Sequence, residues 1–507
     1  MTSTGANTLG DVPSSEEKLG CYSGRYSSRA QVLTPANVDE LGRIFGYARE
    51  TGRRITLRAG AHSFDGQAIG DDLVVSMLGF NMIEVLPEEK LRVGPGARWG
   101  AILAKLKPLG LVPAVTVTTE HATAGGTLSG DCLSRFSPSY GKEGEWIESF
   151  DLLTTEGGLL HCTPPQKGSS PSTWTPKERA FCGVIGGLGY LGAVVSITYR
   201  VLEVGSTPYE IGVRTIVRKY HSFADLSADL VPTAERMRRQ DSDPDDPEKL
   251  DAIWSALDAR GKGEETALFF TSTYTTTPER RLMLLHRPKL LIRFVVEYLM
   301  RVSFFAKLFW SVYFNIIYSD GEEYIDDLEG FAFFMDGNSR AKHFGRRLGF
   351  PMRNAQQTFV VPSDPGVEGG WDRARDDLAE WLEFAHSFLQ ERDLTPTLND
   401  VLFLPRDLPF LLSASSELPG FAVSYAFETS NRSRLKRAEA AFSELADALW
   451  EKFGGRVYLV KNVFAKQETL AKMYGEHAVE FVRLKRELDP RGLLRNDFLE
   501  RTFGDLL

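Results

Sequence analysis

Three glycine-rich stretches before residue 200 could hold the phosphate groups of a ligand. The first is Arg58–Gln67, RAGAHSFDGQ, and the second is Thr118–Asp131, which contains the pair Gly125-Gly126. The third is Gly183–Gly192, with five glycines in ten residues. Backbone amides that are freed in such turns can cradle a pyrophosphate, and glycine allows the backbone to approach a planar ligand closely. Three such stretches in order indicate one large cofactor rather than three unrelated turns.

Other nucleotide-binding motifs do not fit the sequence. The first stretch is not a dinucleotide fingerprint, because G-x-G-x-x-G followed by a helix is absent there. The segment GKEG at 141–144 lacks the spacing of a nucleotide P-loop. H-E-x-x-H, paired cysteines and G-x-S-x-G are also absent. We therefore expect no metal site and no serine nucleophile.

The elements that must position these stretches follow from hydrophobic periodicity. A helix is predicted from Thr34, with Pro35 at its first position and Gly52 at its end, followed by a strand from Ile55 that runs into the first glycine-rich stretch. The other expected elements are strands at 73–77, 91–93, 191–203 and 456–461, a hairpin over 150–163 with its turn at 156–158, and helices at 99–106, 370–391, 432–453 and 468–487.

Length and composition set wider bounds. A chain of 507 residues predicts more than one domain, and a formal charge of −9 does not favour nucleic-acid binding. The four cysteines, Cys21, Cys132, Cys162 and Cys182, are scattered, which favours a reducing compartment. The first 19 residues have no basic or apolar region of a signal peptide and are expected to form a disordered tail. We therefore expect a cytoplasmic protein.

The order of the glycine-rich stretches resembles the flavoproteins of the vanillyl-alcohol-oxidase type, which have a p-cresol-methylhydroxylase-type FAD domain. That pattern is a loop after a strand, a Gly-Gly element and a G-G-x-G-x-x-G-x-V entry to a strand, found here at Arg58–Gln67, Thr123–Gly126 and Gly186–Val194. Further segments are similar to the decaprenylphosphoryl-ribose oxidases and, less so, to the sterol side-chain reductases: Phe333–Asp336, Thr358–Pro362, Gly455–Asn462, Met473-Tyr474 and Leu488–Pro490.

The resemblance implies an α+β fold with a PCMH-type FAD-binding domain over 20–205, a mixed-sheet substrate domain over 206–454, and a return to the FAD domain over 455–507. The implied FAD-binding residues are Arg58, Ala59, Gly60, Ala61, His62, Ser63, Gln67, Thr118, Thr123, Ala124, Gly125, Gly126, Asp131, Cys132, Val194 and Tyr458. Lys461 is the implied catalytic residue, because a fixed ammonium would stabilise the negative charge of reduced flavin. Gln356, Thr358 and Ser424 are the implied substrate residues.

Two positions depart from the ribose oxidases. His62 lies in A-G-A-H-S-F, which resembles the G-x-G-H-S motif in which histidine is bonded to the flavin, although Ala61 replaces a glycine. This implies a covalent flavin through His62. Leu133 replaces a polar residue beside the flavin, so the substrate geometry is expected to differ.

The implied reaction is oxidation of a CH–OH group of a sugar or polyol, free or lipid-linked. The alternatives are a flavin-dependent C=C reductase or desaturase of a sterol-like substrate, and a flavoprotein without catalysis. Residues 281–318 bear on the substrate, because basic residues alternate there with large apolar ones. Such a segment either lies in a membrane interface or packs as helices on the substrate domain.

Overall fold

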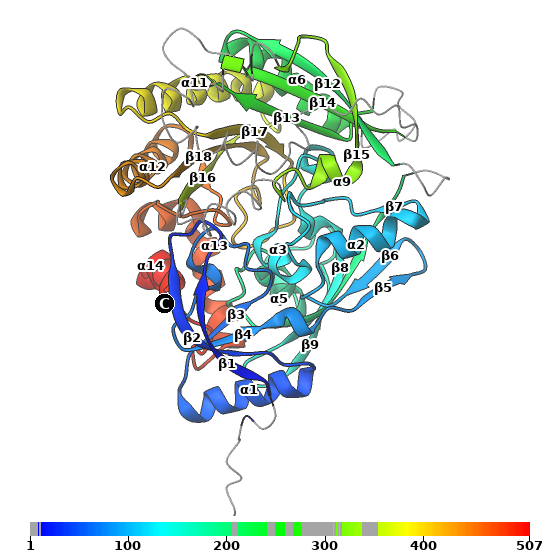
Figure 1. Ribbon diagram of the computed structural model, residues 1–507, viewed down its shortest axis with the longest axis vertical. Helices are drawn as coiled ribbons and strands as arrows, with labels where there is room; N and C mark the ends of the chain where they lie inside the picture. The colour runs from blue at the N-terminus through cyan, green and yellow to red at the C-terminus, as the bar shows by residue number, and fades with distance from the viewer. Residues whose placement is uncertain are drawn as a thin grey trace, which may run out of the picture.

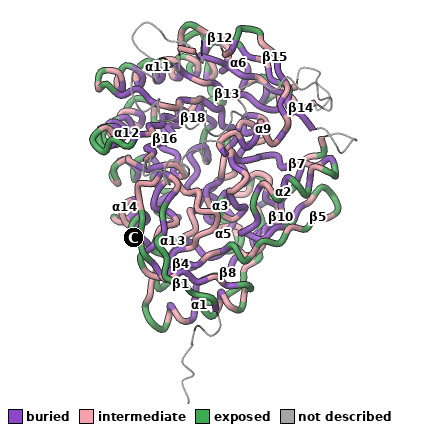
Figure 2. Tube along the Cα trace, in the orientation of Figure 1, coloured by how far each residue is buried: buried purple, intermediate pink, exposed green. Residues whose placement is uncertain are grey.

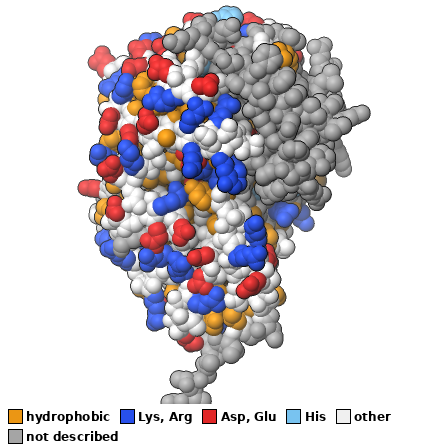
Figure 3. Space-filling view, turned by 60° about the vertical axis from the view of Figure 1, so that its left-hand side comes forward, with side chains coloured by type: hydrophobic (Ala, Val, Ile, Leu, Met, Phe, Trp, Pro, Cys, Tyr) orange, Lys and Arg blue, Asp and Glu red, His pale blue; other side chains and the backbone are white. Residues whose placement is uncertain are grey.

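A computed structural model describes residues 12–204, 211–240, 249–258, 267–275, 317–336 and 353–506, with Leu9, Leu308, Ser311, Val312 and Phe314 as single positions. Residues 281–318, for which membrane contact was considered, therefore lie almost entirely outside the described residues. In the described part of the chain, no helix has the length and apolarity needed to cross a membrane. Acidic and basic side chains lie interspersed on the face shown in Figure 3.

The N-terminal region forms two sheets, in the lower half of Figure 1. One sheet has the order β1-β2-β4-β3, with β1 antiparallel to β2 and the other pairs parallel. The second is antiparallel, in the order β5-β6-β10-β8-β9. Their strands are β1 (Ser14–Gly20), β2 (Ser27–Leu33), β3 (Ile55–Arg58), β4 (Leu73–Ser76), β5 (Ile83–Leu86), β6 (Lys90–Val93), β8 (Ile147–Leu153), β9 (Leu159–Cys162) and β10 (Ala193–Arg200). A short pair, β7 (Leu111–Val112) with β11 (Leu202–Glu203), lies beside them.

The helices of this region lie around the two sheets. They are α1 (Val38–Thr51), α2 (Trp99–Leu106), α3 (Ala124–Gly130), α4 (Ser137–Tyr140) and α5 (Pro176–Val184). The buried face of α1 carries Leu41, Ile44, Phe45 and Ala48, which share a core cluster with strand residues such as Ile55. This apolar stripe at helical spacing is the signal that predicted the helix.

The upper half of the molecule is one large sheet of eight strands, in the order β15-β12-β14-β13-β17-β18-β16-β19 (Figure 1). They are β12 (Gly212–Tyr220), β13 (Ala252–Leu257), β14 (Ala267–Thr275), β15 (Glu323–Asp327), β16 (Arg353–Pro362), β17 (Leu398–Leu404), β18 (Gly420–Thr429) and β19 (Arg456–Val457). Every pair among these described strands is antiparallel, whereas we expected a mixed sheet with parallel and antiparallel pairs. One cause is that chain neighbours, such as β17 and β18, also lie side by side.

Helices pack on one face of this large sheet. They are α6 (Phe223–Gln240), α11 (Gly370–Glu391) and α12 (Arg432–Phe453), and a short helix, α9 (Leu328–Ala332), follows β15. On β16, Phe359 packs its ring against Trp381 of α11 and Phe442 of α12, at centroid distances of 5.4 and 5.9 Å. Figure 2 shows the central strands buried and the outer turns of these helices exposed. Because side chains alternate along a strand, the residues next to Phe359 point to the opposite face of the sheet.

The last two helices contact elements of the N-terminal region, α5 and residues 66–68. They are α13 (Gln467–Leu488) and α14 (Asp497–Phe503), which lie beside β1 and β2 in Figure 1. The Asn496 amide donates hydrogen bonds to the carbonyls of Gly66, Gln67 and Ile69, at 3.0–3.2 Å. Arg501 forms an ion pair with Asp65, which is also in the first glycine-rich stretch. The C-terminal helices therefore hold that stretch from outside.

Most predicted elements are confirmed, and three are corrected. The predicted bounds of α2, α11 and α12 agree with the structure. However, α1 begins at Val38 with Asn37 as its cap, because the Asn37 side chain accepts a hydrogen bond from the Glu40 amide at 2.9 Å. Residues 14–19, expected in a disordered tail, belong to β1, a polar edge strand without an alternating apolar pattern. The strand expected at 456–461 ends at Val457.

Candidate active site

The glycine-rich stretches and the large sheet enclose one cavity of about 590 Å³. Of the predicted cofactor residues, Arg58 to Ser63, Gln67, Thr118, Thr123, Gly125, Gly126, Cys132, Val194 and Tyr458 line it. The predicted substrate residues Gln356, Thr358 and Ser424 line it from the sheet, and Lys461 lines it as well. The structure therefore brings together residues that are more than 400 positions apart in the sequence, such as Arg58 and Lys461.

Two predicted cofactor residues do not line the cavity. Ala124 is fully buried, and its amide donates to the Ala97 carbonyl at 2.9 Å. The Asp131 carboxylate turns away from the cavity to an ion pair with Lys142, at 2.5 Å. Ala124 is the first residue of α3, and Asp131 follows the end of that helix in a left-handed conformation that directs its side chain elsewhere.

The first and second glycine-rich stretches contact each other through backbone. The Gly60 amide donates to Thr123 Oγ1 at 3.2 Å, and a Cβ atom at Gly60 would lie 2.9 Å from the His121 carbonyl oxygen. A Cβ atom at Gly125 would lie 2.4 Å from the Pro95 side chain. These glycines are needed because backbone approaches backbone here, so that the cavity wall is formed largely by main-chain atoms.

The loop at 58–67 is held by its own side chains. The Arg58 guanidinium donates to the carbonyls of Ala68 and Gly20, at 2.9 and 2.8 Å. Ala61 has a φ of 61°, a left-handed conformation that glycine adopts more easily. This explains in physical terms why the related motif has a glycine at that position.

One polar atom of this loop fits a bound ligand. Ser63 lines the cavity, and its Oγ is buried without a hydrogen-bond partner among the described residues. A buried hydroxyl without a partner is destabilising. A phosphate oxygen would satisfy it, so the residues present fit a cofactor with a pyrophosphate group.

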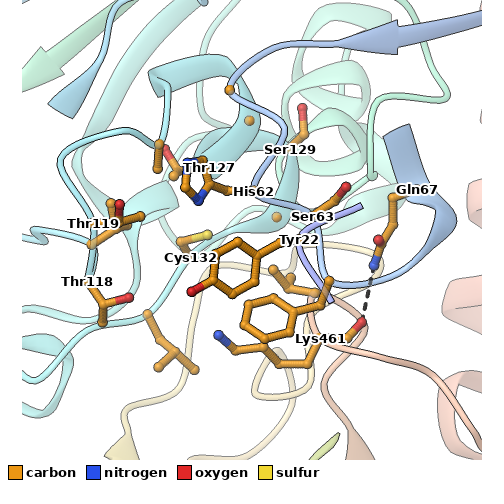
Figure 4. Close-up of a pocket in the computed structure, with 18 of the residues that line it drawn as sticks. Tyr22, His62, Ser63, Gln67, Thr118, Thr119, Thr127, Ser129, Cys132 and Lys461 are labelled. Atoms are coloured by element: carbon orange, nitrogen blue, oxygen red, sulfur yellow. Dashed lines mark hydrogen bonds between the residues drawn. The ribbon is translucent and has the colours of Figure 1, made fainter. Parts of the chain in front are cut away.

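Two aromatic residues next to the loop, Tyr22 and His121, were not predicted. The Tyr22 ring lies 5.5 Å from the His62 ring and 5.0 Å from the Phe64 ring, between centroids, and the Tyr22 amide donates to the Ser63 carbonyl at 2.8 Å. The His62 ring also stacks with His121, at 6.2 Å. Figure 4 shows Tyr22, His62 and Cys132 around the same space. Sequence reasoning missed Tyr22 because it lies in an irregular segment without a glycine pattern.

Lys461 reaches the cavity from a bulge at the edge of the large sheet. The Tyr458 amide donates to the Thr358 carbonyl and the Asn462 amide to the Gln356 carbonyl, so residues 459–461 between them loop out of the pairing. This is why the predicted strand ends early. The Lys461 ammonium lies 4.4 Å from the centroid of the Phe64 ring. The backbone carbonyl of Lys461 accepts a hydrogen bond from Gln67 Nε2 at 3.2 Å (Figure 4).

Tyr458 and Cys132 line the cavity with neutral, protonated side chains. The Tyr458 hydroxyl donates to the Asp131 carbonyl at 2.9 Å, and burial raises its pKa well above the ordinary value. Burial also raises the pKa of the Cys132 thiol. A protonated thiol is a poor nucleophile. This supports the interpretation of Cys132 as a small apolar wall residue.

Three neighbouring strands of the large sheet present polar side chains to the cavity in one row. Thr358 on β16 lies opposite Ser424 on β18, and Ser424 lies opposite Asp400 on β17. The hydroxyls of Thr358 and Ser424 are 2.9 Å apart, at hydrogen-bond distance. Asp400 was not predicted, because an acid in the segment LNDVLFL has no distinguishing pattern in the sequence.

A buried ion cluster joins the two walls of the cavity. Lys142 Nζ lies 2.5 Å from an Asp131 carboxylate oxygen and 2.8 Å from an Asp407 oxygen, and donates to Ser413 Oγ at 2.7 Å. Burial lowers the pKa of Lys142, but the two carboxylates outweigh burial and raise it overall. Burial raises the pKa of Asp131, against the effect of Lys142. The cluster connects α3 to the segment after β17.

Comparison with known proteins identifies the cofactor. Residues 30–163 match the FAD binding domain family, and residues 424–502 match the D-arabinono-1,4-lactone oxidase family. The family resemblance and the cofactor FAD are thus confirmed, whereas the covalent bond through His62 stays a prediction.

Individual relatives match over part of their length. The chain is 25% identical to the decaprenylphosphoryl-β-D-ribose oxidase of Mycolicibacterium smegmatis, over 38% of this chain and 40% of that protein. It is 30% identical to D-2-hydroxyglutarate dehydrogenase of Pseudomonas putida, over 26% and 14%, and 25% identical to L-gulonolactone oxidase of Bos taurus, over 33% and 36%. The matches span less than half the length of each of these curated relatives.

Proposed function

We propose that this chain, whose residues 30–163 match an FAD-binding domain, is an FAD-dependent oxidoreductase that oxidises a CH–OH group of a sugar or polyol. The observation that carries the proposal is one cavity with a glycine-rich wall at one side and the polar row Thr358, Ser424 and Asp400 at the other. Relatives whose names refer to a ribose, a lactone or a hydroxy acid support a polar, oxygen-rich substrate.

The glycine-rich wall would hold the cofactor. Residues 59–63, 187–189, 191 and 192, with Thr123 and Gly126, line that side, and Ser63 offers a hydroxyl to a phosphate oxygen. When bound, FAD supplies an acceptor for a hydride, which carries two electrons. The protein's own contribution is to bind, to orient and to place charge.

Lys461 would place a positive charge where negative charge develops. Its ammonium lies near Phe64 of the loop, and its charge also lowers the pKa of Asp400 on the sheet, so it is close to both walls. A preorganised cation in a site shielded from water stabilises developing negative charge more strongly than one in bulk solvent. The bulge at 459–461 keeps this ammonium in place, because Gln67 binds two of its carbonyls.

The polar row favours an alcohol over a C=C substrate. Hydroxyls on Thr358 and Ser424 and the carboxyl of Asp400 can exchange hydrogen bonds with a polyol, whereas a sterol-like substrate would leave the buried Asp400 Oδ1 without a donor. Gln356 lines the same face, two residues from Thr358. This distribution supports oxidation of a CH–OH group.

The test is anaerobic reduction of the FAD-loaded protein by candidate substrates. A panel of alditols, aldoses, sugar lactols and lipid-linked pentoses would be added, and loss of the oxidised flavin absorbance would be recorded. We expect a subset of these CH–OH compounds to bleach the flavin. Bleaching by reduced nicotinamide alone, followed by reoxidation with an unsaturated terpenoid, would contradict the proposal and support the C=C reductase.

A further inference from the structure

The carboxyl group of Asp400 belongs to the cavity wall. Asp400 lies at one end of the polar row, on β17 between β13 and β18, where its register partners are Ala256 and Ser424. Cross-strand neighbours have Cβ atoms about 5 Å apart, so Asp400 is adjacent to the hydroxyl of Ser424. Leu398 and Leu402, two positions to either side, line the same cavity. The Asp400 side chain is therefore on the cavity face of the sheet.

The hydrogen bonding of Asp400 differs from that of the other carboxylate in the described cavity wall. Its Oδ1 is buried and has no hydrogen-bond partner among the described residues. In contrast, the second carboxylate in the cavity wall, Glu428, accepts from Asn354 Nδ2 at 3.1 Å. Asp336 accepts from Thr119 Oγ1 and from the Glu120 amide. An unsatisfied carboxylate oxygen is destabilising unless a ligand supplies a donor.

The groups that face Asp400 from neighbouring elements are two cations and one hydroxyl. Burial raises the pKa of the Asp400 carboxyl above its ordinary value, against the lowering by Ser424, Lys461 and Arg135. Arg135 is held in place, because its guanidinium lies 3.7 Å from the Phe334 ring centroid and 4.1 Å from that of Trp254. From β13, Ala256 contributes no titratable group. A carboxylate with a raised pKa is a better base near neutral pH.

Five of the other titratable groups that line the cavity are less suitable as a base. The Cys132 thiol and the Tyr458 hydroxyl hold their protons, because burial raises the pKa of each. The Glu428 carboxylate is already a hydrogen-bond acceptor within the protein. The Lys461 and Arg135 side chains carry positive charge and stabilise an anion instead.

We propose that Asp400 is the base that receives the hydroxyl proton of the substrate, an inference that rests on the proposed CH–OH oxidation. The substrate O–H bond breaks and its proton passes to the free Asp400 oxygen. The C–H bond breaks with its electron pair, which leaves as a hydride to the flavin, and a C=O bond forms. The Lys461 ammonium stabilises the substrate oxygen as negative charge develops on it, and Ser424 orients the substrate hydroxyl.

The principal test is the pH profile of anaerobic flavin reduction, measured for the wild type and for Asp400→Asn with whichever substrate bleaches the wild type. The base acts when it is deprotonated, so wild-type reduction should fall as the pH falls through the raised pKa of Asp400. Asp400→Asn should reduce about 10²–10⁴-fold more slowly, the size of a general-base effect, and should lack this acidic limb. Glu323→Gln, an exposed carboxyl at the edge of the same sheet, is the matched control and should behave as the wild type.

Two further measurements separate a chemical role from a structural one. Formate should partly restore flavin reduction by Asp400→Ala, because it can enter the space left by the carboxyl. Infrared titration of the FAD-loaded protein, without substrate, should show a carboxyl band with a raised pKa that disappears in Asp400→Asn.

The outcomes are distinct. If no CH–OH compound reduces the wild type, the proposed function and the base fail together. If the wild type is reduced and Asp400→Asn is reduced within about threefold of its rate, or keeps the acidic limb, Asp400 is not the base although the function stands. An infrared band that titrates at the ordinary pKa of aspartate also overturns the proposal.

Discussion

The glycine-rich wall of the cavity is shaped by main-chain atoms, whereas the sheet wall acts through side chains. Gly60 and Gly125 contact neighbouring backbone or proline at distances that leave no space for a side chain. Thr358, Ser424 and Asp400 instead project from a regular antiparallel sheet whose backbone is ordinary. A wall that needs particular backbone conformations restricts residue types strongly, while a sheet accepts many side chains at each position. The first wall suits a constant cofactor, and the second suits a substrate that can change during evolution.

The largest expected effect comes from removing the ion cluster of Lys142, Asp131 and Asp407, which joins the two walls. Lys142→Met would leave the Asp131 and Asp407 carboxylates buried without a cation. We expect a loss of about 3–5 kcal/mol in the free energy of unfolding, because an uncompensated buried charge is costly. Denaturant unfolding measures it. Lys107→Met, which removes a more exposed pair with Glu329, is the control and should lose at most about 1 kcal/mol. Equal losses in the two variants would contradict the prediction.

The side chain that serves both walls should matter next. Lys461→Ala should bind FAD nearly normally, because the glycine-rich wall holds the cofactor, but reduction by substrate should slow about 10²–10³-fold. Lys461→Arg should restore the rate only in part, since a planar guanidinium does not replace an ammonium. Stopped-flow anaerobic reduction gives these rates. Lys466→Ala, an exposed lysine paired with Asp447, should react as the wild type. A Lys461→Ala rate equal to that of the wild type would remove the residue from the mechanism.

His62 tests whether the glycine-rich wall also uses a side chain. If His62 is bonded to the flavin, acid-precipitated protein should stay yellow, and the peptide with His62 should carry the mass of FAD. His62→Ala should release its flavin into the acid supernatant, while the native variant still binds FAD through the loops. His121→Ala removes the ring that stacks on His62 and should keep the bond. Release of all flavin from the wild-type protein would show that the cofactor is not covalent.

The smallest expected effect is a gain in stability at Ala61. Because its φ is 61°, glycine would relieve a left-handed strain of about 1–2 kcal/mol, less the entropy that glycine loses on folding. Ala61→Gly should therefore change the free energy of unfolding by about +0.5 to +1 kcal/mol. Ala59→Gly in the same loop has no such strain to relieve. It should lower the free energy of unfolding by about 0.5–1 kcal/mol. Thermal or urea unfolding compares them, and a loss in both would argue against strain at Ala61.

The difference between the walls explains what could be predicted from the sequence. The glycine-rich stretches, the end of α1 at Gly52 and the periodic helices α2, α11 and α12 carry strong local patterns, and the structure has them. In contrast, Asp400 and Arg135 reach the cavity through sheet register and long-range packing, which no local pattern encodes. Asp131 was predicted to contact the cofactor because it follows the Gly-Gly element, but its distant partners, Lys142 and Asp407, turn it away.

The bond between Arg501 and the first glycine-rich stretch has a consequence for the order of folding. Asp65 emerges from the ribosome 436 residues before the arginine that pairs with it. Asn496, which holds the carbonyls of Gly66 and Gln67, is also made late. Closing so long a loop costs entropy and delays folding. We therefore expect the first glycine-rich stretch to lack these bonds until α14 has been translated. The nascent chain should bind its flavin tightly only after that point.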